Sequence, residues 1–269
     1  MALDGERLKI SFIYASHRWG GFDVLAGWLA GQSCADAEHE LIVVDGSPIR
    51  TKSGRVPTYL HQHRIPLVWY GEPKPRTFPW STIGYANAVN TGLIHATGTH
   101  VVVVHDFIAA PKDSLVQWHR SFTANTRSMV CGDEMRCQVA DPGGFDDVNT
   151  WASMSPWKKP EQPPTSTEFK LGIWGGPMEL FEECNGLDER ADFRHGWVVN
   201  DLKVKAKLLG WGMARDKGLP YYAADHTAWG GVGPANTIFK STPFADVPYE
   251  PDWTDWSANS FVLAKERRR

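Results

Sequence analysis

The chain has 269 residues, of which 42% are apolar and 22% are charged, with a formal net charge of −3. This length fits one large α/β domain or two small ones, and the charge excludes a chain that is basic throughout. The longest aliphatic run, at 101–104, is far shorter than the ~20 residues of a membrane-spanning helix, and the N-terminal segment lacks the apolar stretch of a signal peptide. The four cysteines form no CxxC pair, so we expect a reducing, cytoplasmic setting.

The first hundred residues alternate between strand-like and helix-like patterns, which predicts a mostly parallel sheet with helices on its faces. In chain order we expect a strand at Leu8–Ser16, a helix at 22–32, strands at 39–47 and 65–70, a helix from Ser81 to Ala96, and a strand at 99–107. Ser81 is a candidate cap for its helix, and Gly98 would end that helix. The uninterrupted valines of the fourth strand are typical of a central strand that is buried on both faces.

The second half of the chain is less regular. A helix is expected from residue 111 to about 125, followed by a strand at 128–132. Residues 138–170 are rich in Pro, Asp, Ser and Thr and predict one long loop, which in a compact domain is usually functional or mobile. Two helical stretches are expected at 171–186 and 197–212, with Val204 and Leu208 facing the core, and an irregular tail from residue 234.

Polar residues follow three of the predicted strands at their carboxyl ends, where open parallel sheets bind ligands. These residues are Ser16, His17 and Arg18 after the first strand, Asp45 after the second, and His105 and Asp106 after the fourth. Each one alone is typical of a turn, but together they indicate a site for a nucleotide and its diphosphate. Neither a GxGxxG nor a GxxxxGK[ST] loop is present, so a divalent cation is the expected partner of the diphosphate.

Short motifs along the chain match one known pattern in order and spacing. They are LIVVDGSP at Asp45; the spaced set Ala88, Asn90, Gly92, Ala96 and Gly98; VVVVHDF at His105 and Asp106; GGPMELFEECNGLDE from Gly175 to Glu189; the pair Asn200-Asp201; and His226 in YYAADHTAWGG. Each motif is weak by itself. Taken together over most of residues 8–230, they resemble the GT-A-fold family-2 glycosyltransferases.

The resemblance implies a GT-A (Rossmann-like) α/β fold, in which helices flank a central, mostly parallel sheet within a single domain. Residues 1–110 would bind the nucleotide sugar, 111–233 would hold the acceptor and the catalytic group, and 234–269 would form the tail. The resemblance also implies transfer of a sugar, with a UDP-sugar as the favoured donor, to an acceptor hydroxyl by an inverting single displacement.

The resemblance further implies a role for each motif residue. Asp45 would bind the nucleobase, Asn90 would belong to the donor site, and Asp201 would be the general base that takes the proton of the acceptor hydroxyl. A divalent metal, Mn²⁺ or Mg²⁺, would be held by Asp106, His105 and His226. The acceptor or sugar would meet Trp174, Gly175, Gly176, Trp197 and Asn200.

Two positions depart from the family pattern. The Asp-x-Asp metal motif of the family reads His105-Asp106-Phe107 here, and Asn200 stands where the family has Glu. A set of His and Asp ligands suits Mn²⁺ better than an all-oxygen cage does. For Asp201 the alternative is a carboxylate that only stabilises the first turn of its helix. For His226 it is a structural histidine, and for Trp174 and Trp197 it is core packing, as for most of the 13 tryptophans.

The acceptor is the least determined part of the function. Basic residues (Arg50, Lys52, Arg55, Arg64, Lys74 and Arg76) alternate between positions 50 and 80 with aromatic and histidine residues (His61, His63, Trp69, Tyr70, Phe78 and Trp80), and the chain ends in KERRR. This pattern fits either a solvated face or a path for nucleic acid. The second interpretation makes a hydroxymethylated base in DNA, such as 5-hydroxymethylcytosine, a candidate acceptor. Polysaccharide, small-molecule and protein hydroxyls remain alternatives.

Two other classes of protein compete with a transferase. A non-catalytic sugar- or nucleotide-binding module on the same fold would explain the altered metal motif, although Asp45 and Asp201 are both present. A nucleotidyltransferase shares the architecture and the metal, but it would be expected to have a glycine-rich basic loop after the first strand. The segment ASHRWGGF is a poor version of such a loop.

Overall fold

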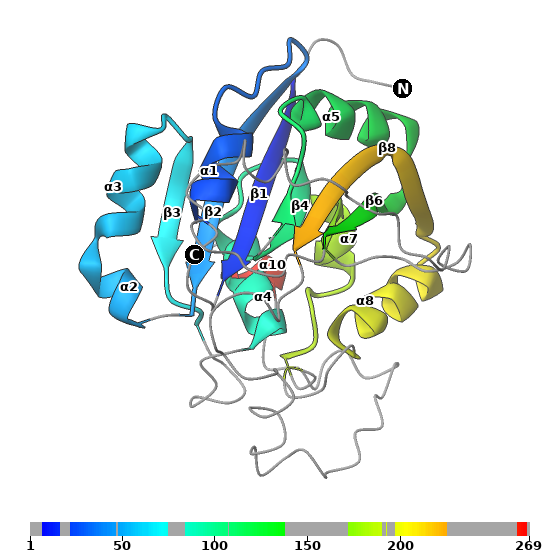
Figure 1. Ribbon diagram of the computed structural model, residues 1–269. Coiled ribbons are helices and arrows are strands. Elements are labelled where there is room, and N and C mark those ends of the chain that lie inside the picture. Colours follow the sequence, from blue (N-terminus) through cyan, green and yellow to red (C-terminus); the bar gives the residue numbers. More distant parts are fainter. Residues whose placement is uncertain are drawn as a thin grey trace.

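The computed structural model describes residues 7–16, 22–46, 48–74, 84–106, 108–137, 172–189, 192, 197–224 and 263–267 (Figure 1). The strands are β1 (Leu8–Ser16), β2 (Ala37–Asp45), β3 (Leu67–Gly71), β4 (His100–His105), β5 (Ile108–Ala109), β6 (Ser128–Cys137), β7 (Ile173–Pro177) and β8 (Gly212–Ala224). The helices are α1 (Phe22–Leu29), α2 (Pro48–Ser53), α3 (Arg55–Gln62), α4 (Tyr85–His95), α5 (Ser114–Ala124), α7 (Met178–Glu183), α8 (Trp197–Leu208) and α10 (Leu263–Glu266). No helix among these residues is long and apolar enough to cross a membrane.

The strands form one eight-stranded sheet in the order β3-β2-β1-β4-β7-β6-β8-β5. Strands β1, β2, β3 and β4 run parallel to one another, β7 is antiparallel to both β4 and β6, and β6 pairs with β8 in parallel. The chain adds β2 and β3 on one side of β1 and then crosses over to place β4 on the other side. The predicted α/β class and the mostly parallel sheet flanked by helices are confirmed.

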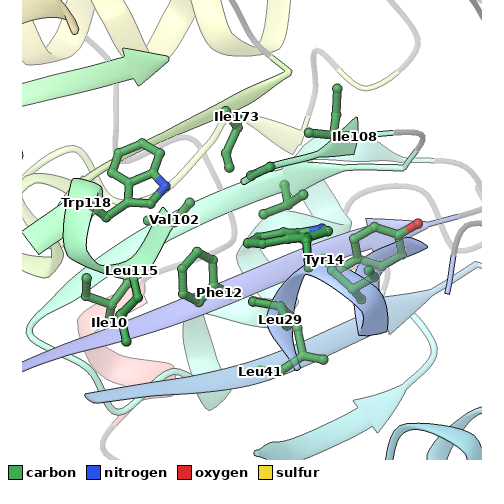
Figure 2. Close-up of a cluster of buried hydrophobic side chains, with 14 of the residues drawn as sticks. Ile10, Phe12, Tyr14, Leu29, Leu41, Val102, Ile108, Leu115, Trp118 and Ile173 are labelled. Atoms are coloured by element: carbon green, nitrogen blue, oxygen red, sulfur yellow. The ribbon is translucent and has the colours of Figure 1, made fainter. Parts of the chain in front are cut away.

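Alternating side chains of the strands build a separate apolar core on each face of the sheet. On one face Phe12 and Tyr14 of β1 pack with Trp28 of α1 and Trp118 of α5 (Figure 2). On the other face α4, α7, α8 and α10 cover Ile13 and its neighbours. The four valines at 101–104 are fully buried, as expected of a strand covered on both faces.

Strand β7 corrects the prediction of a helix from 171 to 186. Only its second part is helical, as α7, whereas Trp174, Gly175 and Gly176 form a strand between β4 and β6. A side chain at position 175 would collide with the carbonyl oxygen of Val101, so glycine permits the close approach of β7 to β4. The glycine pair is therefore part of the sheet and not of an acceptor loop.

Helix α8 presents a different face to the core from the one predicted. Val204 is half-buried and Leu208 is 64% exposed, whereas Leu202 and Ala206 are fully buried. The apolar pattern misled because Asp201, which is buried, lies on the inner side of this helix. Smaller differences are the start of α4 at Tyr85, the extension of β6 to Cys137, and the short helix α10 within the predicted tail. Ser81 and the loop at 138–170 lie outside the described residues.

A buried polar network joins β1, β2 and the turn before β4 at the edge of the sheet opposite the strands' carboxyl ends. Glu40 accepts hydrogen bonds from the Ser11 hydroxyl (2.6 Å) and from the backbone N–H and hydroxyl of Thr97 (2.6 and 2.7 Å). The ammonium of Lys9 lies 2.9 Å away. Burial raises the pKa of Glu40, but the hydrogen bonds from Ser11, Thr97 and Lys9 outweigh it and hold this pKa below its usual value.

We predict that Glu40→Gln destabilises the fold by about 1–3 kcal/mol at pH 7, because the neutral amide replaces charge-assisted hydrogen bonds. A carboxyl whose pKa is lowered by folding stabilises the native state above its unfolded pKa, and this contribution disappears as the pH falls. Urea unfolding should therefore show a larger difference between the two proteins at pH 7 than at pH 3. An equal difference at both pH values would contradict the prediction.

Candidate functional site

Four of the predicted polar residues, Ser16, Asp45, His105 and Asp106, come together at the carboxyl edge of the sheet. Ser16 and Asp45 are direct partners in the register of β1 and β2, and His105 of β4 is the partner of Ala15. Asp106 follows β4 in a turn and is buried. The connection from β1 leads to β2 on one side, and the chain crosses to β4 on the other side of β1 only after β3. The space between β1 and β4 is therefore the topological switch point where such sheets bind ligands.

Asp45 is held in place by a tyrosine on the neighbouring strand. The Tyr70 hydroxyl at the end of β3 donates a hydrogen bond of 2.8 Å to Oδ2 of Asp45, whose side chain is fully buried. A buried carboxylate with a fixed orientation can receive a defined N–H group of a ligand. This role of Tyr70 was not predicted, although the residue lies near the end of a strand at the same edge of the sheet.

His105 is positioned by α4, which begins beside it. The rings of His105 and Tyr85 stack with centroids 4.3 Å apart and an angle of 14° between their planes. The Trp174 indole N–H donates to the Tyr85 hydroxyl at 3.1 Å. Burial raises the pKa of Tyr85, the nearby charge of Asp106 raises it further, and the phenol therefore stays neutral at physiological pH. The stacking contact is made by the face of the imidazole. It therefore fixes the orientation of the ring plane, in which both nitrogens lie.

Trp174 has a packing role in this arrangement. The side chain is fully buried, lies against Phe181 with ring centroids 5.9 Å apart, and uses its N–H to hold Tyr85. The burial of this indole supports a packing role, and the contact of Trp174 with a sugar or an acceptor stays a prediction. With Gly175 and Gly176 in the centre of the sheet, three of the predicted acceptor residues belong to the scaffold.

Asn90 also has a supporting role in the scaffold. Its side-chain amide donates to the carbonyl of Leu187 (2.8 Å) and to Glu189 (3.0 Å), and its oxygen accepts from the N–H of Leu187 (2.9 Å). Asn87, one turn earlier on α4, donates to the other oxygen of Glu189 at 3.0 Å. These bonds fasten the segment after α7 to α4 and use the Asn90 amide that the resemblance assigned to the donor.

Asp192 caps the start of α4. Its two carboxyl oxygens accept the backbone N–H groups of Ala86 (2.5 Å) and Asn87 (2.9 Å). Burial raises the pKa of Asp192 to about 8, the two backbone hydrogen bonds act against this shift, and the charges of Glu189 and Asp188 add to it. A cluster of three buried carboxyls thus lies at the beginning of the helix that carries Tyr85.

Asp201, the predicted general base, lies on α8 in a buried ion pair. Its Oδ2 is 2.8 Å from the ammonium of Lys205, one helical turn away, and both side chains are 3% exposed. Cys184 lies close enough for both charges to affect its pKa, although burial is the main reason that this pKa is raised to about 12. The Asp201 carboxylate is therefore paired with a cation of its own helix.

The remaining predicted residues divide into two groups. Asn200 is exposed on α8. His17, Arg18, His226 and the side chain of Trp197 lie outside the described residues. Within the described part of the chain, no group of three or more His, Cys, Asp or Glu residues is arranged to hold a metal ion, so His105 and Asp106 form a pair of potential ligands there.

The chain matches no protein-family model and no curated protein sequence. Solved structures with a similar fold include the following three. S. aureus TarS is 15% identical, with a TM-score of 0.53 over 81% of this chain and 37% of that protein. A mannosyltransferase from Pyrobaculum calidifontis, in complex with GDP-Man and Mn²⁺, is 16% identical, with a TM-score of 0.53 over 80% of this chain and 56% of the other. GalNAc-T7, with UDP, GalNAc and Mn²⁺, is 14% identical, with a TM-score of 0.58 over 82% and 45%.

These similarities confirm the predicted GT-A-like fold. The chain spans less than two thirds of the length of each of these proteins. At such low identity the likeness extends to the architecture alone. Support for an activity therefore comes from the residues at the carboxyl edge.

Proposed function

We propose that this protein is a glycosyltransferase that moves a sugar from a UDP-sugar donor to an acceptor hydroxyl by an inverting single displacement. The observation that supports the proposal best is the convergence of Ser16, Asp45, His105 and Asp106 on one sheet edge of a GT-A-like fold. Of these residues, Asp45 and His105 are each held by an aromatic side chain of a neighbouring element.

Asp45 would recognise the nucleobase of the donor. An ionised carboxylate only accepts hydrogen bonds, so its ligand has to present an N–H group, as the N3–H of uracil does. The hydrogen bond from Tyr70 orients the carboxylate before the ligand arrives, which reduces the entropy lost on binding. Ser16, the register partner of Asp45, would lie beside the nucleotide.

A divalent cation fits the residues at the end of β4. His105 offers an imidazole nitrogen and Asp106 a carboxylate oxygen, and this mixture of donors suits Mn²⁺. His226 would be the third ligand. When bound, the cation would neutralise the charge that develops on the diphosphate as it leaves. The residues of the chain position the donor for this step, with Tyr85 holding the ring of His105.

In the displacement, the oxygen of the acceptor hydroxyl forms a bond to the anomeric carbon while the bond from that carbon to the UDP oxygen breaks. The hydroxyl proton passes to a carboxylate, which we assign to Asp201, and UDP leaves with the electron pair of the broken bond. A positioned base contributes about 10²–10⁴ in rate. Asn200 and Trp197, which precede Asp201 on the same helix, would contact the acceptor.

For the acceptor we propose a hydroxymethylated base in DNA, such as 5-hydroxymethylcytosine. The exposed cations of α2 and α3 support this choice over an uncharged acceptor such as a neutral polysaccharide or a small molecule. The base would have to leave the duplex to reach the donor edge. A non-catalytic binding module remains the second candidate, because the motif at 105–107 lacks the second carboxylate of the family pattern.

Calorimetric titration of UDP and GDP, each with and without Mn²⁺, tests the donor site. We predict that UDP binds in the presence of Mn²⁺ and that Asp106→Ala weakens binding at least tenfold, about 1.4 kcal/mol, because it removes a metal ligand. Asp36→Ala, which removes an exposed carboxylate elsewhere, should bind as the wild type does. Binding of neither nucleotide would overturn the proposal. Binding without release of UDP from any UDP-sugar would favour the binding module, and production of pyrophosphate would indicate a nucleotidyltransferase.

A further inference from the structure

Helices α2 and α3 lie beside the edge strand β3 (Figure 1), and their exposed side chains form a basic surface. Its exposed cationic or titratable side chains, named here the α2–α3 surface, are Lys52, Arg55, His61, His63 and Arg64. Between residues 48 and 74 the sequence contains one acidic residue, Glu72, and its carboxylate accepts the Thr51 hydroxyl at 2.7 Å. The chain is slightly acidic as a whole, so the charge of this segment is opposite in sign to that of the whole chain.

The cations of this surface form no ion pair with a carboxylate of the described residues, unlike cations elsewhere in the molecule. Lys9, Lys205 and Arg267, for example, lie within 3.1 Å of a carboxylate oxygen. Lys52 and Arg55 have no such neighbour in the part of the chain that the structure describes. Positive charges that are not neutralised internally create a potential that attracts an anionic partner.

Arg64 occupies a backbone conformation that glycine would adopt at lower cost. Its φ is 57°, directly after the C-cap His63 of α3, and the N–H of Ile65 bonds to the carbonyl of Leu60 at 3.1 Å. This is the position at which helices usually end in glycine, because a Cβ atom disfavours the left-handed region. An arginine at this position destabilises the native state relative to glycine, which indicates that its side chain has a use.

The described aromatic rings of the segment already have partners within the molecule. The Tyr59 ring lies 4.5 Å from that of His63, and the Trp69 ring is stacked on His95 at 4.2 Å. Tyr70 donates its hydroxyl to Asp45. Binding of single strands relies on aromatic rings that stack on bases, whereas binding of a duplex relies on contacts to phosphates. The α2–α3 surface offers cations that can contact phosphates, which fits a duplex.

We propose that the α2–α3 surface binds the phosphate backbone of double-stranded DNA. The choice of DNA among polyanions rests on the acceptor proposed above. Helix α2 begins at Pro48, directly after the segment that leaves Asp45, so a bound duplex would lie next to the donor edge. An anionic membrane fits less well, because no large apolar side chain is exposed on the described residues of these two helices to enter a bilayer.

Fluorescence anisotropy of a labelled duplex of about 25 base pairs, titrated over a range of salt concentrations, tests the proposal. Each cation that contacts a phosphate contributes about 0.9 to the slope of log K against log [salt]. The triple variant Lys52→Gln, Arg55→Gln, Arg64→Gln should therefore lower the slope by about 2 to 3 and the affinity at least tenfold. The matched control removes three exposed lysines elsewhere, by Lys112→Gln, Lys207→Gln and Lys217→Gln, and should stay within about twofold of the wild type.

Arg64→Gly separates binding from folding. This variant should raise the melting temperature, because glycine fits the left-handed conformation, and still weaken duplex binding. Equal losses in the triple variant and its control would overturn the proposal, as would a duplex that does not bind or binding only to phosphatidylserine vesicles. UDP titration of the same variants tests the donor site separately. Unchanged UDP binding together with lost DNA binding supports the α2–α3 surface. Absence of UDP binding in the wild type would contradict the proposed donor site and would leave the result for the surface unaffected.

Discussion

Asp201→Asn is expected to lower kcat by about 10²–10⁴-fold while the protein remains folded, because an amide cannot take the proton of the acceptor hydroxyl. The measurement is the release of UDP from UDP-glucose, UDP-galactose or UDP-N-acetylglucosamine, with hydroxymethylated duplex DNA as the acceptor. KM for the donor should change little, because Asp201 lies on α8 and does not belong to the strand ends proposed to bind the nucleotide.

The ion pair with Lys205 demands a control, because loss of either partner leaves the other charge buried at 3% exposure. Breaking such a pair costs about 3–5 kcal/mol, whereas replacing both partners by apolar or neutral groups is often nearly neutral. The experiment therefore compares Asp201→Asn, Lys205→Met and the double variant that carries both substitutions. The single variants should both be destabilised in urea, and the double variant should recover much of that stability.

The double variant distinguishes a base from a structural partner. A general base that is missing cannot be replaced by restoring the packing, so the double variant should be stable and still slow. If kcat recovers together with stability, Asp201 acts only through its pair with Lys205, and the base has to be sought elsewhere. The melting temperature of each variant, measured beside its kcat, keeps the two effects apart.

Local sequence patterns were sufficient to predict the parallel strands β1 to β4 and the edge of the sheet at which they end. The valines at 101–104 have to be buried on both faces, and Asp45 and Asp106 follow strands that carry no other acidic residue near their ends. Because parallel strands end at one edge, the meeting of Ser16, Asp45 and His105 required no knowledge of long-range contacts. The α/β class and the position of the candidate site followed from these features.

Roles that depend on distant segments could not be predicted. Asn90 and Glu189 meet across 99 positions of sequence, and Trp174 contacts Tyr85 across 89. Strand β7 was predicted as helix because five residues buried on both faces show no alternation of polar and apolar side chains. The ion pair of Asp201, in contrast, has a local signal. Lys205 stands at i+4 from Asp201 on a predicted helix, which is the spacing of an ion pair.

The buried carboxyl cluster at the start of α4 leads to the second large prediction. Folding raises the pKa of Asp192 to about 8, with burial as the main cause. A group with a raised pKa stabilises the native state most below its unfolded pKa, near 4, and this stabilisation is lost as the pH rises toward 8. The free energy of unfolding of the wild type should therefore fall by roughly 1 kcal/mol per pH unit between pH 5 and 8 from this group.

Asp192→Asn should remove this part of the pH dependence. The amide oxygen can still accept one of the two N–H groups at the start of α4, so the variant loses only part of the cap, about 1 kcal/mol. Below pH 5 the wild type should be the more stable protein, and above pH 8 the variant should be, because it buries no charge beside Glu189 and Asp188. Urea midpoints at four pH values would show the crossing, and parallel curves would contradict the raised pKa. Helix α4 also carries Tyr85, which holds the ring of His105. If the cap governs the geometry of the donor edge, the Mn²⁺-dependent affinities of the two proteins for UDP should cross over the same pH range.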